Sequence, residues 1–329
     1  MIEPVRWGVL GTAKFAMNRW LPSFVTAPDV RGVAIASRDA EKARAACEQF
    51  GFERSYGSYD ELLADPDVEA VYIPLPNGLH GEWALKAIAA GKHVLSEKPA
   101  WKDAAEARAV VDAARAAGVR VMEGFMTRHH ARWKRVRQRI DAGDIGVPKL
   151  FTGAFCFTLD DAANARWNPS LAGGALADVG SYCVNAARLC FGAEPTHAWG
   201  LSEDTRGTGV DSTFSGGLRF PTGHATFVCS FETAFQQSAA IVGTEGSIAL
   251  NRPFICREEP VLLTLTSAHG DPTEERLPVG DQYVDTLNHL NACIRDMAKP
   301  LWPGEDGLAS ALVLDALRAS ARSGVVAPI

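Results

Sequence analysis

The stretch GVLGTAKFA, residues 8–16, is the part of the sequence that decides the fold. It joins a short apolar run, which ends at Gly11, to a segment that is compatible with a helix from Phe15 onward. The spacing Gly11-x-Ala13-x-x-Ala16 is a degenerate form of the fingerprint with which a strand, a tight turn and a helix bind a dinucleotide. Alanine replaces the second glycine, so an ordinary strand-to-helix turn is the alternative. The surrounding sequence favours the dinucleotide.

The first part of the chain alternates apolar runs with helical segments. The clearest helix covers residues 103–118 and ends at Gly118. Further apolar runs that indicate buried strands lie at residues 32–37, 69–76, 91–96 and 119–125. Strands that are separated by crossover helices form a parallel sheet with right-handed connections. We therefore predict a doubly wound α/β Rossmann domain over residues 1–124.

The pattern changes after about residue 125. Residues 148–159 alternate apolar and polar side chains, which is typical of an antiparallel strand, and a helix interrupts the strands near 174–192. Similar strands are expected around residues 210–232, 238–250 and 261–267. We predict that residues 125–329 form an α/β domain with an open, mostly antiparallel sheet. The amphipathic last helix, residues 306–323, is expected to pack back onto the first domain.

The composition excludes several classes of protein. The 329 residues are 47% hydrophobic and 22% charged, so the chain is neither disordered nor fibrous. The net charge is only −6, and the basic run at residues 128–139 has the spacing of one solvated helix face, so we do not expect nucleic-acid binding. His129 and His130 are adjacent and diverge by about 100° on a helix, which argues against a shared metal site.

The cysteines and the N-terminus indicate where the protein works. Seven cysteines without a Cys-x-x-Cys pair suit a reducing compartment, in which thiols act as small core side chains. The sequence shows neither a leader pattern nor a run of apolar residues long enough to span a membrane. We expect a soluble, cytoplasmic protein.

The tip of the second strand indicates which dinucleotide binds. An NAD enzyme usually has an acid there for the ribose 2′-hydroxyl, whereas this chain has Ser37 and Arg38. A hydroxyl and a guanidinium suit a 2′-phosphate, and Arg38 can also stack on adenine. Asp39 precedes a helical segment and is more readily explained as its N-cap. We predict NADP(H).

Four motifs resemble one family over nearly the whole chain. GVLGTAKFA, IPLPNGLH (73–80), SEKPA (96–100) and GGALADVGSY (173–182), in this order and spacing, resemble the glucose–fructose oxidoreductase/inositol dehydrogenase (Gfo/Idh/MocA) family. The Glu-Lys-Pro step is the most specific of them, and QY at 282–283 also fits. The segments TAKFA, EGFMTRHH and DVGSY look most like the branch of dimeric dihydrodiol dehydrogenases and sugar dehydrogenases.

The resemblance implies three catalytic residues. Lys98 matches the lysine that family members keep beside the nicotinamide ring and the substrate, and Pro99 matches a proline that often follows a cis peptide bond. Asp178 matches the family's aspartate. Tyr182 occupies the acid/base position, where many members have histidine.

The chemistry of these residue types agrees with the resemblance. Asp178 and Tyr182 are four apart on a predicted helix and so share a face. A free tyrosine has a pKa of about 10, and an ammonium within a few ångströms favours its phenolate. We expect Tyr182 to be the acid/base, Lys98 to tune it and bind the reacting oxygen, and Asp178 to orient the sugar or Lys98. Each residue also has a structural alternative. Tyr182 could be packed in the core, Asp178 could cap a helix, and Lys98 could form an ion pair with Glu97.

The resemblance also implies a set of cofactor contacts. Residues 74–80 follow the third predicted strand, where ligands of such sheets bind, and Arg166 matches an arginine that contacts cofactor in some relatives. A surface role is the alternative for His80 and for Arg166. The expected cofactor-binding residues are Gly11, Thr12, Ala13, Lys14, Phe15, Ser37, Arg38, Pro74, Leu75, Asn77, His80, Glu97, Lys98 and Arg166.

Together these observations predict an NADP-dependent oxidoreductase that acts on a hydroxyl or hemiacetal of a sugar or cyclic polyol. Oxidation of an aldose at C1 is the first choice. The alternatives are reduction of a keto-sugar, oxidation of a trans-diol, an aldose–aldose oxidoreductase that retains NADP, and a non-catalytic NADP-sensing regulator. An exposed face on the open sheet favours oligomers, because large apolar faces rarely stay exposed, and the resemblance to the dimeric branch implies a homodimer, with a higher homo-oligomer as the alternative. The sequence does not rank the sugars, because a few pocket contacts decide specificity.

Overall fold

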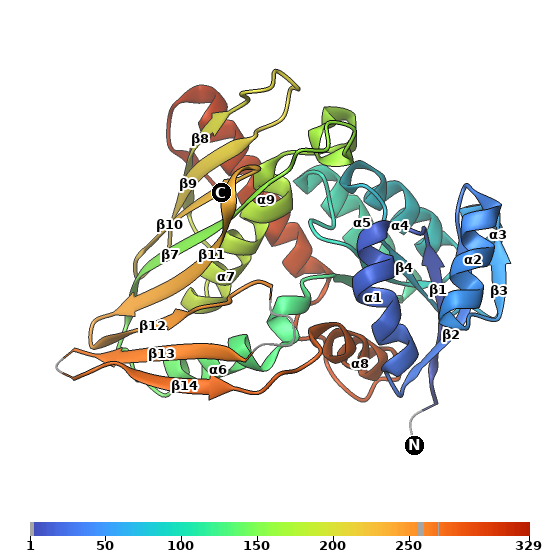
Figure 1. Ribbon diagram of the computed structural model, residues 1–329, viewed down its shortest axis with the longest axis horizontal. Coiled ribbons are helices and arrows are strands. Elements are labelled where there is room, and N and C mark those ends of the chain that lie inside the picture. The colour runs from blue at the N-terminus through green and yellow to red at the C-terminus, as the bar shows by residue number, and fades with distance from the viewer. Residues whose placement is uncertain (1–2, 256–259, 269) are drawn as a thin grey trace. The chain divides into compact units, whose positions relative to one another are not determined.

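The computed structural model describes residues 3–255, 260–268 and 270–329 (Figure 1). Cys256, one of the seven predicted thiols, lies outside the described residues. The other six cysteines are free, and all but Cys47 are buried, as expected for core thiols. Within the described ranges, no helix is both long and apolar enough to cross a membrane.

The first sheet has six strands, all parallel to their neighbours, in the order β3-β2-β1-β4-β5-β6. The strands are β1 (Val5–Leu10), β2 (Val30–Ala36), β3 (Arg54–Tyr56), β4 (Ala70–Ile73), β5 (His93–Ser96) and β6 (Val121–Glu123). The crossover helices are α1 (Lys14–Thr26), α2 (Ala40–Phe50), α3 (Tyr59–Leu63), α4 (His80–Ala89) and α5 (Ala104–Ala117). This strand order is that of a doubly wound dinucleotide-binding sheet, so the predicted fold class is confirmed.

Local sequence explains where these helices begin and end. The Asp39 side chain accepts the Lys42 backbone N–H at 3.2 Å and caps α2, as predicted. Asp103 caps α5 through the Glu106 backbone N–H at 2.8 Å. Gly118, with φ of +68°, ends that helix in the left-handed conformation, which glycine adopts without steric cost.

The second sheet is open and mostly antiparallel, with the order β14-β13-β12-β11-β7-β10-β9-β8-β15. Only β7 and β10 pair in parallel among its described strands. Its strands are β7 (Pro148–Thr158), β8 (His197–Glu203), β9 (Thr213–Arg219), β10 (His224–Ser230), β11 (Glu232–Gly243), β12 (Gly246–Leu250), β13 (Val261–Ser267), β14 (Thr273–Leu277) and β15 (Ala327–Pro328). Helix α7 (Ser181–Phe191) packs against β7, β10 and β11, and α6 (Ala131–Asp141) against β13 (Figure 1).

Contacts along the chain define two compact units, and each contains two segments. The first consists of Met1–Met126 and Asp281–Leu308, and the second of Thr127–Gly280 and Ala309–Ile329. The sequence predicts one division, between residues 124 and 125, and that boundary stays a prediction. It does not foresee the return of the chain after residue 280, which no local pattern marks.

The last two helices show this return. Helix α8 (Gln282–Ile294) lies with the parallel sheet, where Asn291 Oδ1 accepts the indole N–H of Trp7 at 3.0 Å. Helix α9 (Gly304–Ser323) begins in the first unit and continues in the second. Its Ser310 and Ser320 accept hydrogen bonds from Arg188 and Gly200 of the second unit. The expectation that this helix packs back onto the first domain stays a prediction.

A buried histidine joins the loops that follow β4 and β5. The two ring nitrogens of His80 lie 2.6 Å from the carbonyl oxygen of Leu75 and 3.0 Å from that of Pro99. His80 is fully buried, which excludes the surface role, and burial lowers its pKa to about 4. The fold therefore favours the neutral ring, whose single N–H donates to one of these two carbonyl oxygens.

Stability should therefore depend on pH through His80. The pKa of His80 lies below the ordinary value of about 6.5, so its contribution is present above that pH and is lost as pH falls toward 4. Replacing His80→Gln should remove roughly 3 kcal/mol of the decline in unfolding free energy between pH 7 and pH 4. Urea unfolding of both proteins at several pH values measures this. The exposed His224→Gln should keep the wild-type slope, and equal slopes for all three proteins would contradict the assignment.

Candidate active site

The loop between β1 and α1 is shaped to take an anion. Gly11 has φ of +129°, and a Cβ there would lie 3.1 Å from Leu75 Cδ2 and 3.7 Å from the Tyr59 hydroxyl. Ala13 stands at the N-cap of α1 and has no polar atom with which to cap the first-turn N–H groups. Lys14 and Phe15 are exposed in that turn. The loop therefore offers backbone N–H groups and a helix N-terminus to a phosphate.

The end of β2 lies beside this loop. Thr12 Oγ1 donates to Ser37 Oγ at 3.4 Å, and Ser37 Oγ accepts the Asp39 backbone N–H at 3.2 Å. Arg38 is exposed and lies close enough to Tyr59 to lower the pKa of that phenol, against the larger opposite effect of burial. The Lys42 backbone N–H lowers the pKa of Asp39. Asp39 thus caps the helix, so Ser37 and Arg38 are the residues at this strand end that could bind a ligand.

The segment 97–100 is held by buried polar atoms. Glu97 accepts the Tyr72 hydroxyl at 2.8 Å and the Lys98 backbone N–H at 3.2 Å, and burial raises its pKa. Glu123 accepts the Ala100 backbone N–H at 2.9 Å. The Lys98–Pro99 peptide bond is cis, as the resemblance implies, and Lys98 is 8% exposed. The structure thus fixes this lysine at the carboxyl ends of the parallel strands.

The remaining predicted residues of the first unit lie in the loop after β4. Pro74 is buried, whereas Leu75 and Asn77 are partly exposed. A short 3₁₀ turn, Asn77–Leu79, leads into His80 and α4. Because His80 is buried between two carbonyl groups, it positions the loops, and a direct contact of His80 with cofactor stays a prediction.

Asp178 and Tyr182 begin the helical segment of the second unit. Asp178 lies in a π-helical turn, Leu176–Gly180, which precedes α7, and Tyr182 is the second residue of α7. Arg166 Nε donates to Asp178 Oδ2 at 2.5 Å, so two predicted site residues form an ion pair. At the start of this turn a second acid, Asp211, accepts the Leu176 backbone N–H at 2.5 Å. Burial raises the pKa of Asp211 to about 6.

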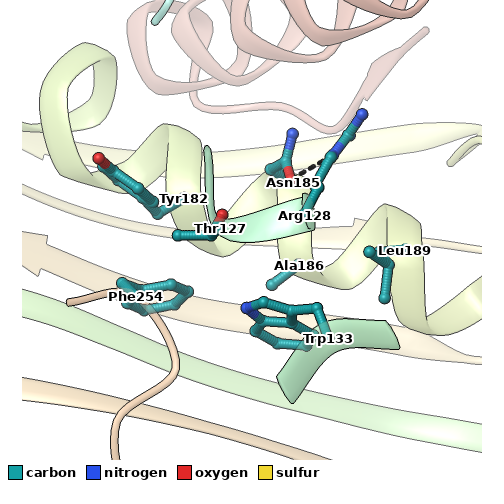
Figure 2. A pocket seen from close by; sticks show the side chains of 8 residues that line it. All are labelled: Thr127, Arg128, Trp133, Tyr182, Asn185, Ala186, Leu189 and Phe254. Atoms are coloured by element: carbon teal, nitrogen blue, oxygen red, sulfur yellow. Dashed lines mark hydrogen bonds between the residues drawn. The ribbon is translucent and has the colours of Figure 1, made fainter. Parts of the chain in front are cut away.

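Two aromatic rings hold the phenol of Tyr182. Its ring centroid lies 5.3 Å from that of Phe155, edge-on, and 5.6 Å from that of Phe254. Figure 2 shows the Tyr182 ring beside Phe254, with its hydroxyl directed away from Ala186 and Leu189. The residue is 5% exposed. Tyr182 is therefore packed through its ring, as the alternative supposed, while its hydroxyl points away from this packing.

The basic run at residues 128–139 is a solvated face only in part: Lys134 is exposed and Arg135, Arg137 and Arg139 are partly exposed, but Arg128 and Arg132 are buried. Arg132 is fully buried, and its guanidinium donates to the carbonyl oxygens of Pro253 and Phe254, both at 2.8 Å. Arg128 is also buried and donates from Nε to Asn185 Oδ1 at 2.5 Å (Figure 2). The error arose because helical spacing shows which residues share a face, but not what covers that face.

His129 and His130 are buried as well. The His130 ring accepts the Arg132 backbone N–H at 3.1 Å and caps α6. Within the described residues, no three histidine, cysteine or acidic side chains are grouped to hold a metal ion.

The structure gathers the predicted residues into two groups. The first unit holds the β1 loop, the end of β2, the loop after β4 and segment 97–100, and the second holds Arg166, Asp178 and Tyr182. A contact between Lys98 and Tyr182 stays a prediction. Sequence reasoning missed Tyr72, Glu123, Asp211 and Phe254. For Tyr72, Glu123 and Asp211, the only signal in the sequence was a hydroxyl or carboxylate in or beside an apolar strand. No sequence signal indicated Phe254.

Family models match both parts of the chain. Residues 5–125 match the model described as "Oxidoreductase family, NAD-binding Rossmann fold", and residues 133–249 match the "GFO/IDH/MocA C-terminal domain". The chain is 36% identical to D-xylose 1-dehydrogenase (NADP(+)) 2 of Haloferax volcanii, over 97% of this chain and 98% of the relative.

Two solved structures are also similar. The aldose–aldose oxidoreductase of Caulobacter crescentus, solved with glycerol, superposes with a TM-score of 0.92 at 28% identity, over 99% of this chain and 100% of that one. A 3-ketoreductase from Actinomadura kijaniata, solved with NADP and TDP-benzene, gives a TM-score of 0.91 at 31% identity, over 97% and 98% of the two chains. With both of its domains matched, this chain belongs to the GFO/IDH/MocA family of NAD(P)-dependent oxidoreductases.

Proposed function

We propose that this protein is an NADP-dependent dehydrogenase that oxidises the C1 hydroxyl of an aldose. The observation that carries the proposal is the start of the helical segment in the second unit. There Asp178, paired with Arg166, stands one turn before Tyr182, whose phenol is fixed by Phe155 and Phe254. A fixed phenol next to a paired carboxylate is suited to bind a polyol and to exchange a proton with one of its hydroxyl groups.

The residues of the first unit fit an NADP molecule. Gly11 has a conformation and a close contact that a side chain would disturb, which suits backbone approach to a pyrophosphate. Ser37 and Arg38 would hold the 2′-phosphate, and the first turn of α1 would hold the pyrophosphate. When bound, the nicotinamide accepts the hydride that leaves the substrate carbon.

The side chains of this chain would move the proton. As the C–H bond of the substrate carbon breaks, the hydroxyl group on that carbon transfers its proton to the phenolate oxygen of Tyr182. The carbon–oxygen bond then becomes a C=O bond. Lys98 would favour the phenolate and bind the reacting oxygen. The Arg166–Asp178 pair would hold neighbouring hydroxyl groups.

The similarity to a xylose 1-dehydrogenase supports oxidation at C1, because that relative aligns over nearly the full chain. The similarity to a 3-ketoreductase favours the second candidate, reduction of a keto-sugar, and the aldose–aldose oxidoreductase favours an enzyme that keeps NADP between turnovers. These candidates differ in direction and substrate but share the proton path through Tyr182. Oxidation of a trans-diol on a ring would use the same groups.

We further propose that the second sheet pairs two copies of the chain. Its strands alternate buried and exposed residues, and the exposed face carries Leu150, Trp199, Leu201 and Val242. The Trp199 indole lies over Gly217 of the neighbouring strand, since a Cβ at that glycine would meet the ring at 2.2 Å. A second copy of the same face is a suitable cover for a broad apolar sheet. A cytoplasmic location is proposed from the six free cysteines of the described residues, which suit a reducing compartment.

The substrate class is tested by NADP⁺ reduction across aldoses, keto-sugars, inositols and trans-diols, after measuring NADP in the purified protein. Aldoses should give the highest kcat/KM. Tyr182→Phe should lower kcat by about 10²–10⁴ because the proton acceptor is lost, without changing the Kd of NADPH. Tyr56→Phe, which removes the hydroxyl bound to Asp65, is the control and should keep wild-type kcat. Wild-type turnover by Tyr182→Phe would remove Tyr182 from the mechanism, and a panel without any turnover would favour a regulator.

The cofactor is tested by direct binding. Arg38→Ala should weaken NADP⁺ by roughly 10- to 100-fold and NAD⁺ by less than about threefold, since only NADP⁺ carries the phosphate that the guanidinium pairs with. Isothermal titration calorimetry gives both Kd values. Arg44→Ala, an exposed arginine of α2 paired with Glu41, makes the same charge change and should alter neither. Equal losses for both nucleotides, or tighter binding of NAD⁺ by the wild type, would show that the assignment is wrong.

Pairing through the sheet is tested by a charge on its exposed face. Leu201 is 62% exposed, and Leu201→Glu should convert a dimer to a monomer at micromolar concentration because it would bury two carboxylates. Light scattering after size exclusion measures the mass. Met297→Glu changes a side chain of similar exposure, 64%, in the first unit and should leave the dimer intact. A wild-type monomer, or a dimer in both variants, would contradict this surface.

A further inference from the structure

Strand β11 carries a bulge opposite the end of β7. Glu232 pairs with Thr158, and Gln236 pairs with Cys156, so two steps along β7 match four steps along β11. The intervening residues 233–235 therefore project from the ladder. Bulges re-aim side chains and are common beside active sites, so the side chains of this bulge are candidates for ligand contacts.

The bulge is anchored on both sides. On one side, Glu232 accepts the Ser212 hydroxyl at 2.9 Å, and Thr158 Oγ1 donates to the Thr233 carbonyl at 2.9 Å. On the other side, the Gln237 amide accepts the backbone N–H groups of Phe254 and Ile255 at 3.0 and 2.8 Å. The bulge is thus a fixed part of the sheet, and a side chain that it presents is held in place before any ligand arrives.

Phe235 is the large side chain that this bulge presents. It is 60% exposed, although it stands next to a well-packed aromatic cluster. Its ring meets that of Phe155 edge-to-face, with centroids 6.4 Å apart and planes at 87°. Phe155 in turn contacts Tyr182 at 5.3 Å and stacks on Phe254 at 5.3 Å. Phe235 is therefore one ring removed from the phenol assigned to proton transfer.

The side of the sheet agrees with this position. Gln237 pairs with Phe155, and paired residues of neighbouring strands point to the same face. Phe235 lies two residues before Gln237, and its ring contact with Phe155 shows that the bulge keeps it on that face. This is the face on which α7 carries Tyr182, and it is opposite to the exposed face of Leu201. An uncovered aromatic ring beside polar groups is typical of a binding pocket wall.

We propose that Phe235 is a substrate-specificity residue, whose ring stacks on the apolar C–H face of a cyclic sugar while Tyr182, Asp178 and Arg166 take its hydroxyl groups. A sugar ring has a polar rim and less polar faces, and the second unit offers a matching arrangement of polar groups and one exposed aromatic plane. The inference rests on the proposed function and adds the binding mode of the substrate to it. Because Phe235 does not reach the reacting atoms, it contributes to substrate binding and leaves the chemical step unchanged.

The test compares kinetic constants for the best sugar of the substrate panel. Phe235→Ala should raise KM by roughly tenfold, with kcat within about threefold of wild type, since it removes an apolar contact that the sugar makes both before and during reaction. Phe235→Trp should restore KM to within about threefold, whereas Phe235→Leu should lie between. The Kd of NADP⁺ and the melting temperature should not change, because the side chain is mostly exposed.

A matched variant and three outcomes make the test decisive. Val325→Ala trims another exposed apolar side chain of the second unit, 64% exposed, and should leave KM unchanged. If the wild type turns over sugars but Phe235→Ala keeps its KM, the binding mode is overturned while the proposed function stands. A loss of dimer mass in Phe235→Ala at unchanged KM would likewise overturn it, in favour of a subunit contact. If the wild type turns over no cyclic sugar, the proposed function fails and this inference fails with it.

Discussion

The structure depends on a buried carboxylate, Glu97, at the end of the parallel sheet. Its charged form is disfavoured by burial, yet it accepts two hydrogen bonds, from the Tyr72 hydroxyl and from the Lys98 backbone N–H. The Glu97 backbone N–H reaches the Ile73 carbonyl at 3.1 Å, which joins the ends of β4 and β5. His80 contacts the carbonyl oxygen of Pro99, and Glu123 accepts the backbone N–H of Ala100. Together with Glu97 they fix the backbone that carries Lys98.

In the second unit, aromatic rings and the buried guanidinium of Arg132 hold the residues around Tyr182 in place. Arg132 and Gln237 hold the backbone of residues 253–255, and that backbone places Phe254 against Tyr182. The two units thus fix their chemical groups by different means. One uses hydrogen bonds at strand ends, where the backbone must turn. The other also packs aromatic rings against the side chain that it positions.

Much of the fold could be predicted because its signals are local. Alternating strands and helices, the caps Asp39 and Asp103, and the glycine at residue 11 each depend on a few neighbouring residues. The supports of the site are different in kind. Asp211 reaches Leu176 across 35 positions and Arg132 reaches Phe254 across 122, so no pattern in a short window reveals them. Burial of Arg132 was missed for this reason, and so was the return of α8 to the first sheet.

The π-helical turn at Leu176–Gly180 has a consequence for how this site can change during evolution. Such a turn holds one residue more than an α-helical turn, so it behaves as a single-residue insertion within the helix. Loss of one residue there would let the helix continue regularly, and it would rotate everything before it by about 100° relative to Tyr182. If the lost residue lay between Asp178 and Tyr182, their separation would fall from four residues to three and the direction of Asp178 relative to the tyrosine would change, while α7 could keep its contacts with the sheet. The gain or loss of a single residue in this turn therefore switches between two relative arrangements of Asp178 and Tyr182.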